Sequence, residues 1–284
     1  MSETKIFTLK DGTNMCYTEN GSGRPVIFIH GWGESKKNWE AYVDPIADAG
    51  FRYICMDQRA SKDTEPSKTR PVTLDMLTND VHDLIEGLGL EDVTLVGHSM
   101  GVGISLQYIR FFGCEHLHSL VLMDCPPRDS VCEGYDYALY GNTYTVEEAH
   151  KAADWMMRDM KDYLTDWIKG SAPDIKNAPD PEKAAEDWAV NYMSAFHVQE
   201  TAELYDSLVG NDYRDALPKI TIPTLYLYPA PGNICVEDTW KIYKEQITGP
   251  VTVESFPSTS HFFCLEEEHL PAVKKAMVQF LREQ

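Results

Sequence analysis

Residues 97–101 read GHSMG, and they lie between an apolar run at 93–96 and a helix-like segment at 102–109. This order predicts a strand, a tight turn and a helix, with Ser99 at the tip of the turn. Small residues beside a serine permit the strained backbone of such a turn, which lifts the hydroxyl out of the sheet. The first amides of a helix have no intrahelical partner, so the N–H of Met100 faces the same point. The pattern therefore favours a nucleophilic serine over a serine that only caps a helix.

Strand-like and helix-like segments alternate on both sides of this turn. The first two strands, at 5–10 and 14–18, read as a hairpin around Asp11-Gly12. Continuous apolar runs predict buried strands at 26–29, 51–56, 93–96 and 117–123, and apolar residues at helical spacing predict helices at 38–49, 73–88 and 102–112. Because strands that alternate with helices build parallel sheets with right-handed crossovers, we expect an α/β protein with a doubly wound, mostly parallel sheet.

The alternation stops after residue 125 and resumes near residue 216. The block between them contains helical patterns at 146–168 and 182–209, separated by prolines. It is followed by strand patterns at 223–228 and 251–256 and by a last helix at 268–282. The block is therefore an insertion into one sheet rather than an independent tail.

We expect a core domain built from residues 1–125 and 216–284, with residues 126–215 inserted after the sixth strand as a helical cap. An insertion at this point lies over the edge of the sheet where such folds bind ligands. The block 126–215 holds 19 acidic and 8 basic residues, a net charge of −11. A field of this sign would discourage anionic substrates, although a solvated acidic surface is the simpler explanation.

The chain as a whole is strongly acidic. Its 284 residues include 25 Lys and Arg and 45 Asp and Glu, for a formal net charge of −20. This charge disfavours nucleic acids and anionic membrane surfaces as partners. No apolar run reaches membrane-spanning length, the first residues contain no apolar signal core, and the seven cysteines are interpreted as free thiols. We expect a cytoplasmic protein that acts on a small molecule, and the sequence carries no signal for an oligomeric state.

Nucleophilic catalysis by Ser99 requires a base and hydrogen-bond donors for the oxyanion. His261 is the candidate base, since its loop between the last strand and the last helix returns to the edge of the sheet where Ser99 lies. The expected oxyanion donors are the backbone N–H groups of Met100 and of Trp32, which belongs to the loop HGWG at 30–33.

Several motifs taken together resemble the α/β-hydrolase superfamily over nearly the whole chain. They are HGWG at 30–33, DQR at 57–59, GHSMG at 97–101 and SHF at 260–262, which is followed by LEE at 265–267. The resemblance implies an eight-stranded, mostly parallel sheet with a helical cap inserted after strand 6. It also implies, most often, hydrolysis of esters or amides through an acyl-enzyme.

Two features depart from the usual pattern of this superfamily. Arg59 is followed by Ala-Ser-Lys-Asp rather than by a glycine-containing turn, which predicts a loop of different shape. The loop at 229–233, where the acid partner of the histidine usually lies, reads PAPGN and contains no carboxylate. Asp124, at the end of the last strand before the cap, is the preferred candidate for this acid, with Asn233 and Asp238 as alternatives. Some superfamily members, among them small esterases and cofactor-free ring-cleaving dioxygenases, place their acid at the position of Asp124.

The first functional hypothesis is a serine hydrolase that cleaves a small neutral ester through an acyl-enzyme. Ser99 would be the nucleophile, His261 the base and Asp124 the acid that orients it, while Trp32 and Met100 would form the oxyanion hole. A second hypothesis keeps the fold and uses a His–Asp pair to deprotonate the substrate, as in the cofactor-free dioxygenases. A third is a ligand-sensing protein that retains the triad.

Two other motifs receive structural interpretations. Cys114, His116 and His118 lack a fourth ligand at the spacing of zinc sites. His98, beside the nucleophile, is interpreted as a packing residue. We therefore expect neither a metal nor a cofactor.

Overall fold

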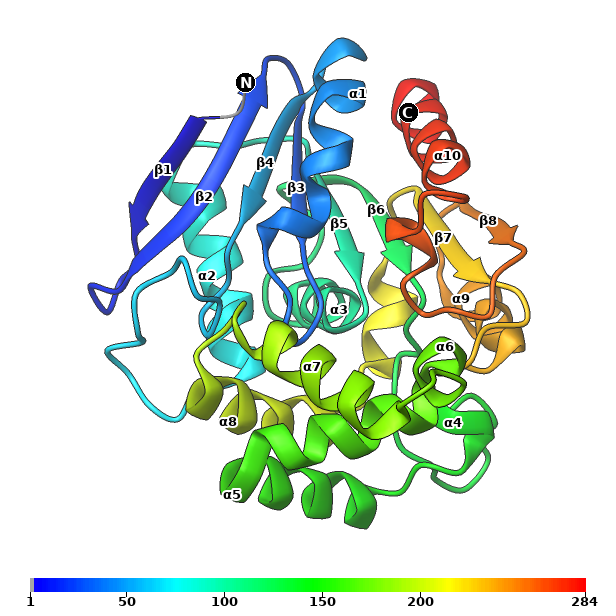
Figure 1. Cartoon of the computed structure of the whole chain (residues 1–284). Coiled ribbons are helices and arrows are strands. Elements are labelled where there is room, and N and C mark those ends of the chain that lie inside the picture. Colours follow the sequence, from blue (N-terminus) through cyan, green and yellow to red (C-terminus); the bar gives the residue numbers. More distant parts are fainter. Residues whose placement is uncertain (1–2) are drawn as a thin grey trace.

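The hairpin predicted around Asp11 and Gly12 forms one edge of the sheet (Figure 1). The computed structural model describes residues 3–284. β1, Glu3–Thr8, pairs antiparallel with β2, Asn14–Gly21. β2 in turn pairs antiparallel with β4, Arg52–Met56, and so joins the hairpin to the parallel part of the sheet.

The remaining strand pairs are all parallel. The strands concerned are β3 (Pro25–Ile29), β4, β5 (Val93–His98), β6 (Leu117–Met123), β7 (Thr224–Pro229) and β8 (Val251–Phe256), and the order across the sheet is β1-β2-β4-β3-β5-β6-β7-β8. Every residue of β3 and β5 is buried, as is typical of central strands covered on both faces. The predicted eight-stranded, mostly parallel, doubly wound sheet is confirmed.

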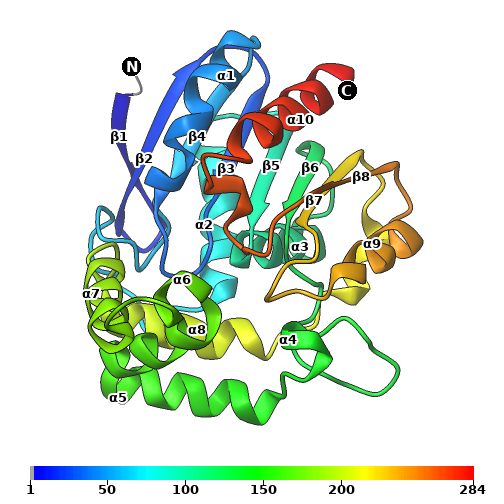
Figure 2. The same ribbon diagram turned by 45° about the vertical axis from the view of Figure 1, so that its right-hand side comes forward.

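Helices cover both faces of the sheet (Figures 1 and 2). One core layer includes side chains of α2 (Leu74–Gly87), α3 (Met100–Phe112) and α9 (Trp240–Gln246). The other includes side chains of α1 (Val43–Asp48) and α10 (Leu270–Glu283). Within residues 3–284 there are also four short 3₁₀ helices: η1 (Lys36–Tyr42), η2 (Arg214–Lys219), η3 (Glu237–Thr239) and η4 (Phe263–Leu265).

The helix predicted at 38–49 is divided in the structure. Its first part is the 3₁₀ helix η1, and only α1 is α-helical. Pro45 lies in the first turn of α1, where its missing N–H costs nothing, but a continuous α-helix through 38–49 would need that N–H.

Between β6 and β7 the chain forms a helical insert, which lies beyond the carboxyl ends of the parallel strands (Figures 1 and 2). Its helices are α4 (Leu139–Asn142), α5 (Val146–Ser171), α6 (Pro173–Lys176), α7 (Pro181–Met193) and α8 (Val198–Val209). A capping box fixes the start of α5. Thr145 Oγ1 accepts the N–H of Glu148 at 3.1 Å, and the Glu148 carboxylate accepts the N–H of Thr145 at 2.8 Å.

The prediction of one continuous helix over 182–209 is wrong. α7 and α8 are separated by a turn at 194–197. The backbone of this turn bonds to the core instead of continuing the helix, through two hydrogen bonds of 2.6 and 2.8 Å with residues 60–62. Phe196, in the same turn, is buried. Apolar spacing continues across the turn, so the break depends on tertiary contacts that periodicity does not show.

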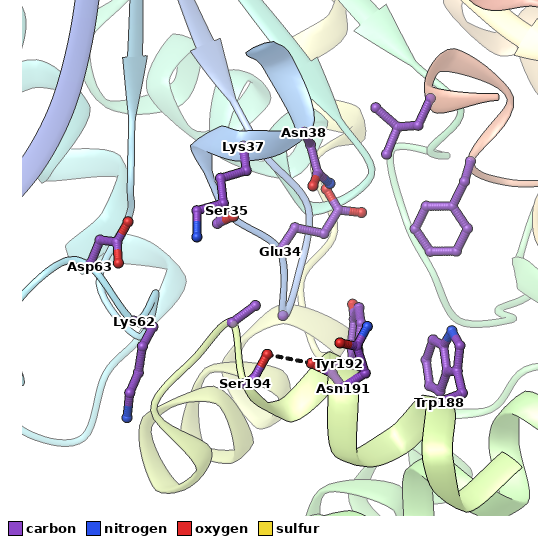
Figure 3. A pocket seen from close by; sticks show the side chains of 14 residues that line it. Glu34, Ser35, Lys37, Asn38, Lys62, Asp63, Trp188, Asn191, Tyr192 and Ser194 are labelled. Atoms are coloured by element: carbon purple, nitrogen blue, oxygen red, sulfur yellow. Dashed lines mark hydrogen bonds between the residues drawn. The ribbon is translucent and has the colours of Figure 1, made fainter. Parts of the chain in front are cut away.

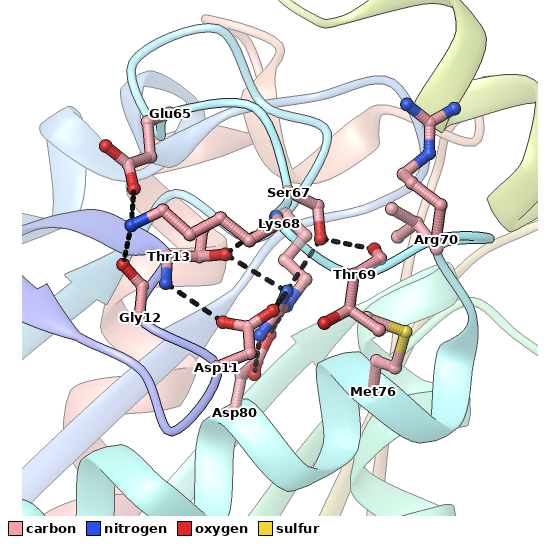
Figure 4. A network of polar contacts seen from close by, with 12 residues as sticks. Asp11, Gly12, Thr13, Glu65, Ser67, Lys68, Thr69, Arg70, Met76 and Asp80 are labelled. Atoms are coloured by element: carbon pink, nitrogen blue, oxygen red, sulfur yellow. Dashed lines mark hydrogen bonds and ion pairs between the residues drawn. The ribbon is translucent and has the colours of Figure 1, made fainter.

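Arg59 connects the hairpin to α2. Its guanidinium donates two hydrogen bonds to Asp80, of 2.6 and 3.0 Å, and Nη1 also donates to Asp11 at 2.6 Å and to Ser67 at 2.7 Å. Figure 4 shows Asp11, Ser67 and Asp80 converging on one point. Burial raises the pKa of Asp80 to about 6, against the effect of the guanidinium. Ala60, the next residue, has a φ of 73°, so the loop after Arg59 takes a conformation uncommon for non-glycine residues.

Between residues 3 and 284, no helix is both long enough and apolar enough to cross a membrane. The seven cysteines are all free thiols, as predicted.

Candidate active site

Ser99 lies at the sharp turn between β5 and α3. Its φ of 53° and ψ of −121° are uncommon for a non-glycine residue and indicate local strain. The flanking glycines leave no room for a side chain: a Cβ on Gly97 would lie 2.4 Å from the carbonyl carbon of Gly101, and a Cβ on Gly101 would lie 2.3 Å from the carbonyl oxygen of Ile29. The N–H of Ser99 donates to the carbonyl oxygen of Met123 at 3.0 Å, which fixes the turn to β6.

The structure brings His261 and Asp124 together from two separate loops. Nδ1 of His261 lies 2.6 Å from Oδ2 of Asp124, and both residues are buried. Asp124 follows β6 with a φ of 47°, and its N–H donates to the carbonyl oxygen of Leu227 at 3.0 Å. A buried carboxylate on Nδ1 selects the tautomer of the imidazole and leaves Nε2 as the nitrogen that can take up a proton.

The two alternatives to Asp124 have other roles. Oδ1 of Asn233 accepts the backbone N–H of His261 at 3.2 Å. Asp238 is exposed and pairs with Lys241 at 2.6 Å. Asp124 is therefore the carboxylate that contacts the imidazole, whereas Asn233 contacts only the backbone of the same residue.

Ser99, His261 and Asp124 line one cavity of about 100 Å³, referred to below as the inner cavity. Trp32 and Met100 line it as well, so the five residues selected from the sequence meet at one place. Aromatic side chains of the helical insert form much of the remaining wall: Tyr140, Tyr163, Trp167, Tyr192 and Tyr205. The sequence could not distinguish these rings from the aromatic core of the insert, because both kinds occur at helical spacing.

The loop after β3 is held in place by the helical insert. Nε1 of Trp32 donates to the carbonyl oxygen of Thr201 at 2.9 Å, and the hydroxyl of Tyr192 donates to the carbonyl oxygen of Trp32 at 2.8 Å. Gly33 has a φ of 70°, and a Cβ there would meet the Tyr192 ring at 2.9 Å, so this position requires glycine. Within the described residues, the N–H groups of Trp32 and Met100 donate to no protein group. Both amides are therefore available to a ligand.

A second imidazole–carboxylate pair, which the sequence analysis missed, lies beside His261. Nε2 of His98 lies 2.9 Å from the backbone oxygen of His261, and the two ring centroids are 4.8 Å apart. Nδ1 of His98 lies 3.6 Å from Oε1 of Glu34, and Oε2 of Glu34 accepts the N–H of Gly31 at 2.9 Å. The interpretation of His98 as a packing residue is therefore incomplete, since its ring links the loop after β3 to the loop of His261.

Glu34 and His98 shift each other's pKa. Burial disfavours the charged form of both groups, but their attraction outweighs it: the pKa of His98 is raised and the pKa of Glu34 is lowered. A protonated His98 carries a hydrogen on each ring nitrogen, so Nε2 donates to the carbonyl oxygen of His261. The sequence contains one signal for the Glu34–His98 pair, which is that Glu34 comes directly after the HGWG loop.

A larger outer cavity of about 600 Å³ is lined by a second set of residues (Figure 3). Glu34, Tyr192 and Phe262 line both. The outer cavity carries the basic side chains of Lys37 and Lys62, whereas no lysine or arginine lines the inner cavity within the described chain. The two cavities therefore differ in charge, and three side chains lie at the boundary between them.

Asp124, His261 and Cys235 place three possible metal ligands within 4.8 Å of one another. The first two are already bonded to each other, and Sγ of Cys235 lies 3.2 Å from the backbone oxygen of Asp124. Burial raises the pKa of the Cys235 thiol well above its ordinary value, so the thiolate that metals bind is disfavoured. This donor set fits a hydrogen-bonded group better than a metal site.

Comparison with known proteins agrees with the fold. A family model described as alpha/beta hydrolase fold matches residues 24–268. A non-heme chloroperoxidase of Kitasatospora aureofaciens is 26% identical over 282 residues, which cover 97% of this chain and 98% of the relative. Among solved structures, an esterase of Exiguobacterium antarcticum superposes with a TM-score of 0.82 at 25% identity, covering 99% of this chain and 100% of the esterase. A bromoperoxidase of Bacillus anthracis superposes with a TM-score of 0.78 at 23% identity, covering 99% and 100%. Because the family model spans most of the sequence, the chain belongs to the alpha/beta hydrolase fold family.

Proposed function

We propose that the protein is a serine hydrolase that cleaves a small carboxylic ester without an anionic group, through an acyl-enzyme. The observation that carries the proposal is the 2.6 Å contact between His261 Nδ1 and Asp124 Oδ2 in the cavity that Ser99 also lines. A strained serine, an imidazole and a buried carboxylate are the three groups that nucleophilic acyl transfer requires.

The acylation step follows from these groups. His261 Nε2 removes the proton of the Ser99 hydroxyl as its oxygen attacks the ester carbonyl. Asp124 stabilises the imidazolium that forms and does not itself take up the proton. The imidazolium then passes this proton to the alcohol as it leaves.

The tetrahedral intermediates carry a negative oxygen, which the N–H groups of Trp32 and Met100 would bind. Preorganised amides act there more strongly than water, because they need no reorganisation as the charge develops. In the second half of the cycle, water deprotonated by His261 attacks the acyl group on Ser99; the bond to the Ser99 oxygen then breaks, the imidazolium returns its proton to that oxygen, and the acid is released.

The volume and the charge of the inner cavity favour a small substrate. The cavity volume of about 100 Å³ lies below the range of about 300–1,000 Å³ that is typical of sites for drug-sized ligands. The three carboxyl groups in its wall belong to Glu34, Asp124 and Asp129. An anionic substrate would lose hydration there without gaining a cationic partner.

Labelling with an organophosphonate, followed by peptide mass mapping, tests the proposal directly. We expect one adduct, on Ser99, and no adduct after His261→Ala, because the serine is then no longer activated. Turnover of a panel of short-chain esters separates an enzyme from a ligand-sensing protein. An unlabelled Ser99 together with no ester turnover would reject the proposal.

A second candidate activity is the oxidation of halide by hydrogen peroxide. It is favoured by the chloroperoxidase of Kitasatospora aureofaciens, which aligns with 97% of this chain. Bromination of a chromogenic diketone in peroxide and bromide, with and without Ser99→Ala, tests it. Bromination that exceeds the protein-free control and is lost with Ser99 would support this activity.

A further inference from the structure

Asp129 is a carboxyl group for which the proposed mechanism has no use. It lies five positions after Asp124, at the start of the helical insert. Its side chain lines the inner cavity together with Ser99 and His261, and the residue is 9% exposed. The N–H of Leu139 donates to its backbone oxygen at 2.9 Å, which fixes the position of the residue.

The protein leaves this carboxylate almost without partners. Oδ1 lies 3.9 Å from Sγ of Cys125, a weak contact, and Oδ2 has no hydrogen-bond partner within residues 3–284. The adjacent cation, Arg128, is directed elsewhere, since Nη1 donates to Asp212 at 2.9 Å and Nε donates to the carbonyl oxygen of Ser130 at 2.8 Å. An uncompensated carboxylate in a buried position is costly, so a ligand that supplies the missing positive charge would be strongly favoured.

The other groups in the wall also favour a cation. Two of the three carboxyl groups are occupied, because Asp124 is bonded to His261 and Glu34 is bonded to Gly31. Asp129 is the carboxyl group that remains. The insert contributes several aromatic side chains to the same wall, those of Tyr140, Tyr163, Trp167 and Tyr205 among them. The faces of such rings attract ammonium groups.

The pKa of Asp129 agrees with this placement. Burial raises it to about 7, while the Cys125 thiol and Arg128 lower it less strongly. The titratable groups that interact electrostatically with Asp129 are the thiols of Cys125 and Cys235, the guanidinium of Arg128 and the hydroxyls of Tyr135, Tyr140, Tyr144, Tyr213 and Tyr243. A bound cation would favour the ionised carboxylate and lower this pKa.

We propose that Asp129 anchors an ammonium group of the substrate, so that the preferred substrate is a small ester that also carries a positive charge. The proposal rests on the ester hydrolysis proposed above and adds a specificity-determining residue to it. The carboxylate would pair with the cation, the aromatic rings would surround its alkyl groups, and the ester carbonyl would lie at Ser99.

A matched pair of esters tests this specificity. In 2-(trimethylammonio)ethyl acetate a nitrogen cation stands where 3,3-dimethylbutyl acetate has a neutral carbon, and the two are otherwise alike in shape. We expect Asp129→Asn to lower kcat/KM for the cationic ester by about 10- to 100-fold more than for the neutral ester, since the electrostatic attraction between carboxylate and cation is lost only in the first case.

The matched control is Asp136→Asn. Asp136 lies in the same part of the insert, is exposed, and carries the same charge, so this variant changes the net charge equally without altering the cavity. It should leave the ratio of the two kcat/KM values unchanged. Equal losses on both esters in Asp129→Asn, or an equal shift in Asp136→Asn, would overturn the proposal.

The pH dependence of the same ratio gives a second measurement. Both esters keep their charge at all pH values used, so a pH effect on the chemical steps that they share cancels in the ratio. Because Asp129 ionises near a pKa of about 7, the ratio of cationic to neutral kcat/KM should rise from about pH 6 to about pH 8 in the native protein. It should be flat in Asp129→Asn. A flat ratio in the native protein would contradict the proposal.

Binding can be measured without catalysis, which separates this inference from the proposed function. Tetramethylammonium should quench tryptophan fluorescence in Ser99→Ala, because Trp32 and Trp167 line the inner cavity. Its Kd should rise about 10-fold or more when Asp129→Asn is added. If no ester is turned over but tetramethylammonium binds in this way, the ester-hydrolase proposal fails and the cation site stands. If esters are turned over but tetramethylammonium binding is the same with and without Asp129, the cation site fails.

Discussion

Nε2 of His98 lies 2.9 Å from the backbone oxygen of His261, so the residue before the nucleophile holds the loop that carries the base. Glu34 raises the pKa of His98 and so favours the form in which Nε2 donates to this oxygen. His98 contacts the backbone of His261 and therefore acts as a positioning residue. The His98 side chain thus couples the positions of the nucleophile and the base, although it takes no part in the chemical steps.

Replacing His98 by leucine should lower kcat by about 10- to 100-fold and leave KM nearly unchanged, because a displacement of the base by a fraction of an ångström affects the transition state more than binding. His98→Gln keeps a side-chain N–H donor and should recover part of the loss. Steady-state kinetics on one ester, together with thermal unfolding of both variants, provides the measurement. Equal kcat values for the two variants would show that the hydrogen bond has no positioning role.

Ser99→Ala should abolish ester turnover and leave the fold intact, since alanine is smaller than serine and the turn tolerates small residues. We expect kcat to fall by about 10⁴-fold or more, as in other serine hydrolases that lose their nucleophile. Circular dichroism would verify folding. Substantial activity of Ser99→Ala on a genuine substrate would instead favour proton abstraction by the His261–Asp124 pair.

Asp124→Asn should keep the geometry but favour the wrong tautomer of His261, which lowers kcat by about 10²- to 10⁴-fold. Asp238→Asn is the matched control, because Asp238 pairs with Lys241 on the surface. Asn233→Ala should have a smaller effect than Asp124→Asn, since it removes one bond to the backbone of His261. The reverse ranking would assign the orienting role to the loop after β7.

Arg59→Met should lower the free energy of unfolding by about 3–5 kcal/mol, because it leaves the buried carboxylate of Asp80 without its partner. Urea unfolding followed by fluorescence measures this change. Lys183→Met, at the exposed pair with Asp187, is the control and should change the midpoint little. Similar losses for both variants would mean that the Arg59 network contributes no more than a surface ion pair.

Asp129 should make the stability of the protein depend on pH. Its pKa is about 7 in the folded protein and 3.8 in the absence of structure, so the folded state binds more protons between these values. Stability therefore falls as the pH rises from about 4 to about 7, at up to about 1.4 kcal/mol per pH unit. Asp129→Asn should remove this component, so its stability relative to the native protein should increase over the same range. Urea unfolding at several pH values checks this, and a constant difference between the two proteins would contradict it.

The strands and the turn at Ser99 could be predicted because local patterns determine them. Buried parallel strands read as continuous apolar runs, and the turn at 97–101 needs glycines for steric reasons that the structure shows at Ile29 and Gly101. Asp124 could be selected by its place at the end of a strand, because parallel strands bring their carboxyl ends to one edge.

Other features depend on contacts that local patterns do not show. The apolar spacing continues through residues 194–197, but a turn separates α7 from α8 there. The backbone of this turn bonds to a distant loop instead of continuing the helix. The pairing of Glu34 with His98 joins residues on two different loops, and the pKa shifts arise only after both are buried. The rings that line the inner cavity differ from those in the core of the insert only in the direction that the side chains take.

The turn at 194–197 also fastens the helical insert to the core domain. The N–H of His197 donates to the carbonyl oxygen of Ala60 at 2.6 Å, and the N–H of Lys62 donates to the carbonyl oxygen of Ala195 at 2.8 Å. An insert fastened at its middle as well as at both chain ends cannot swing outward as a hinged lid without breaking these bonds. Rotation of the side chains at the boundary of the two cavities, by contrast, would leave both bonds intact.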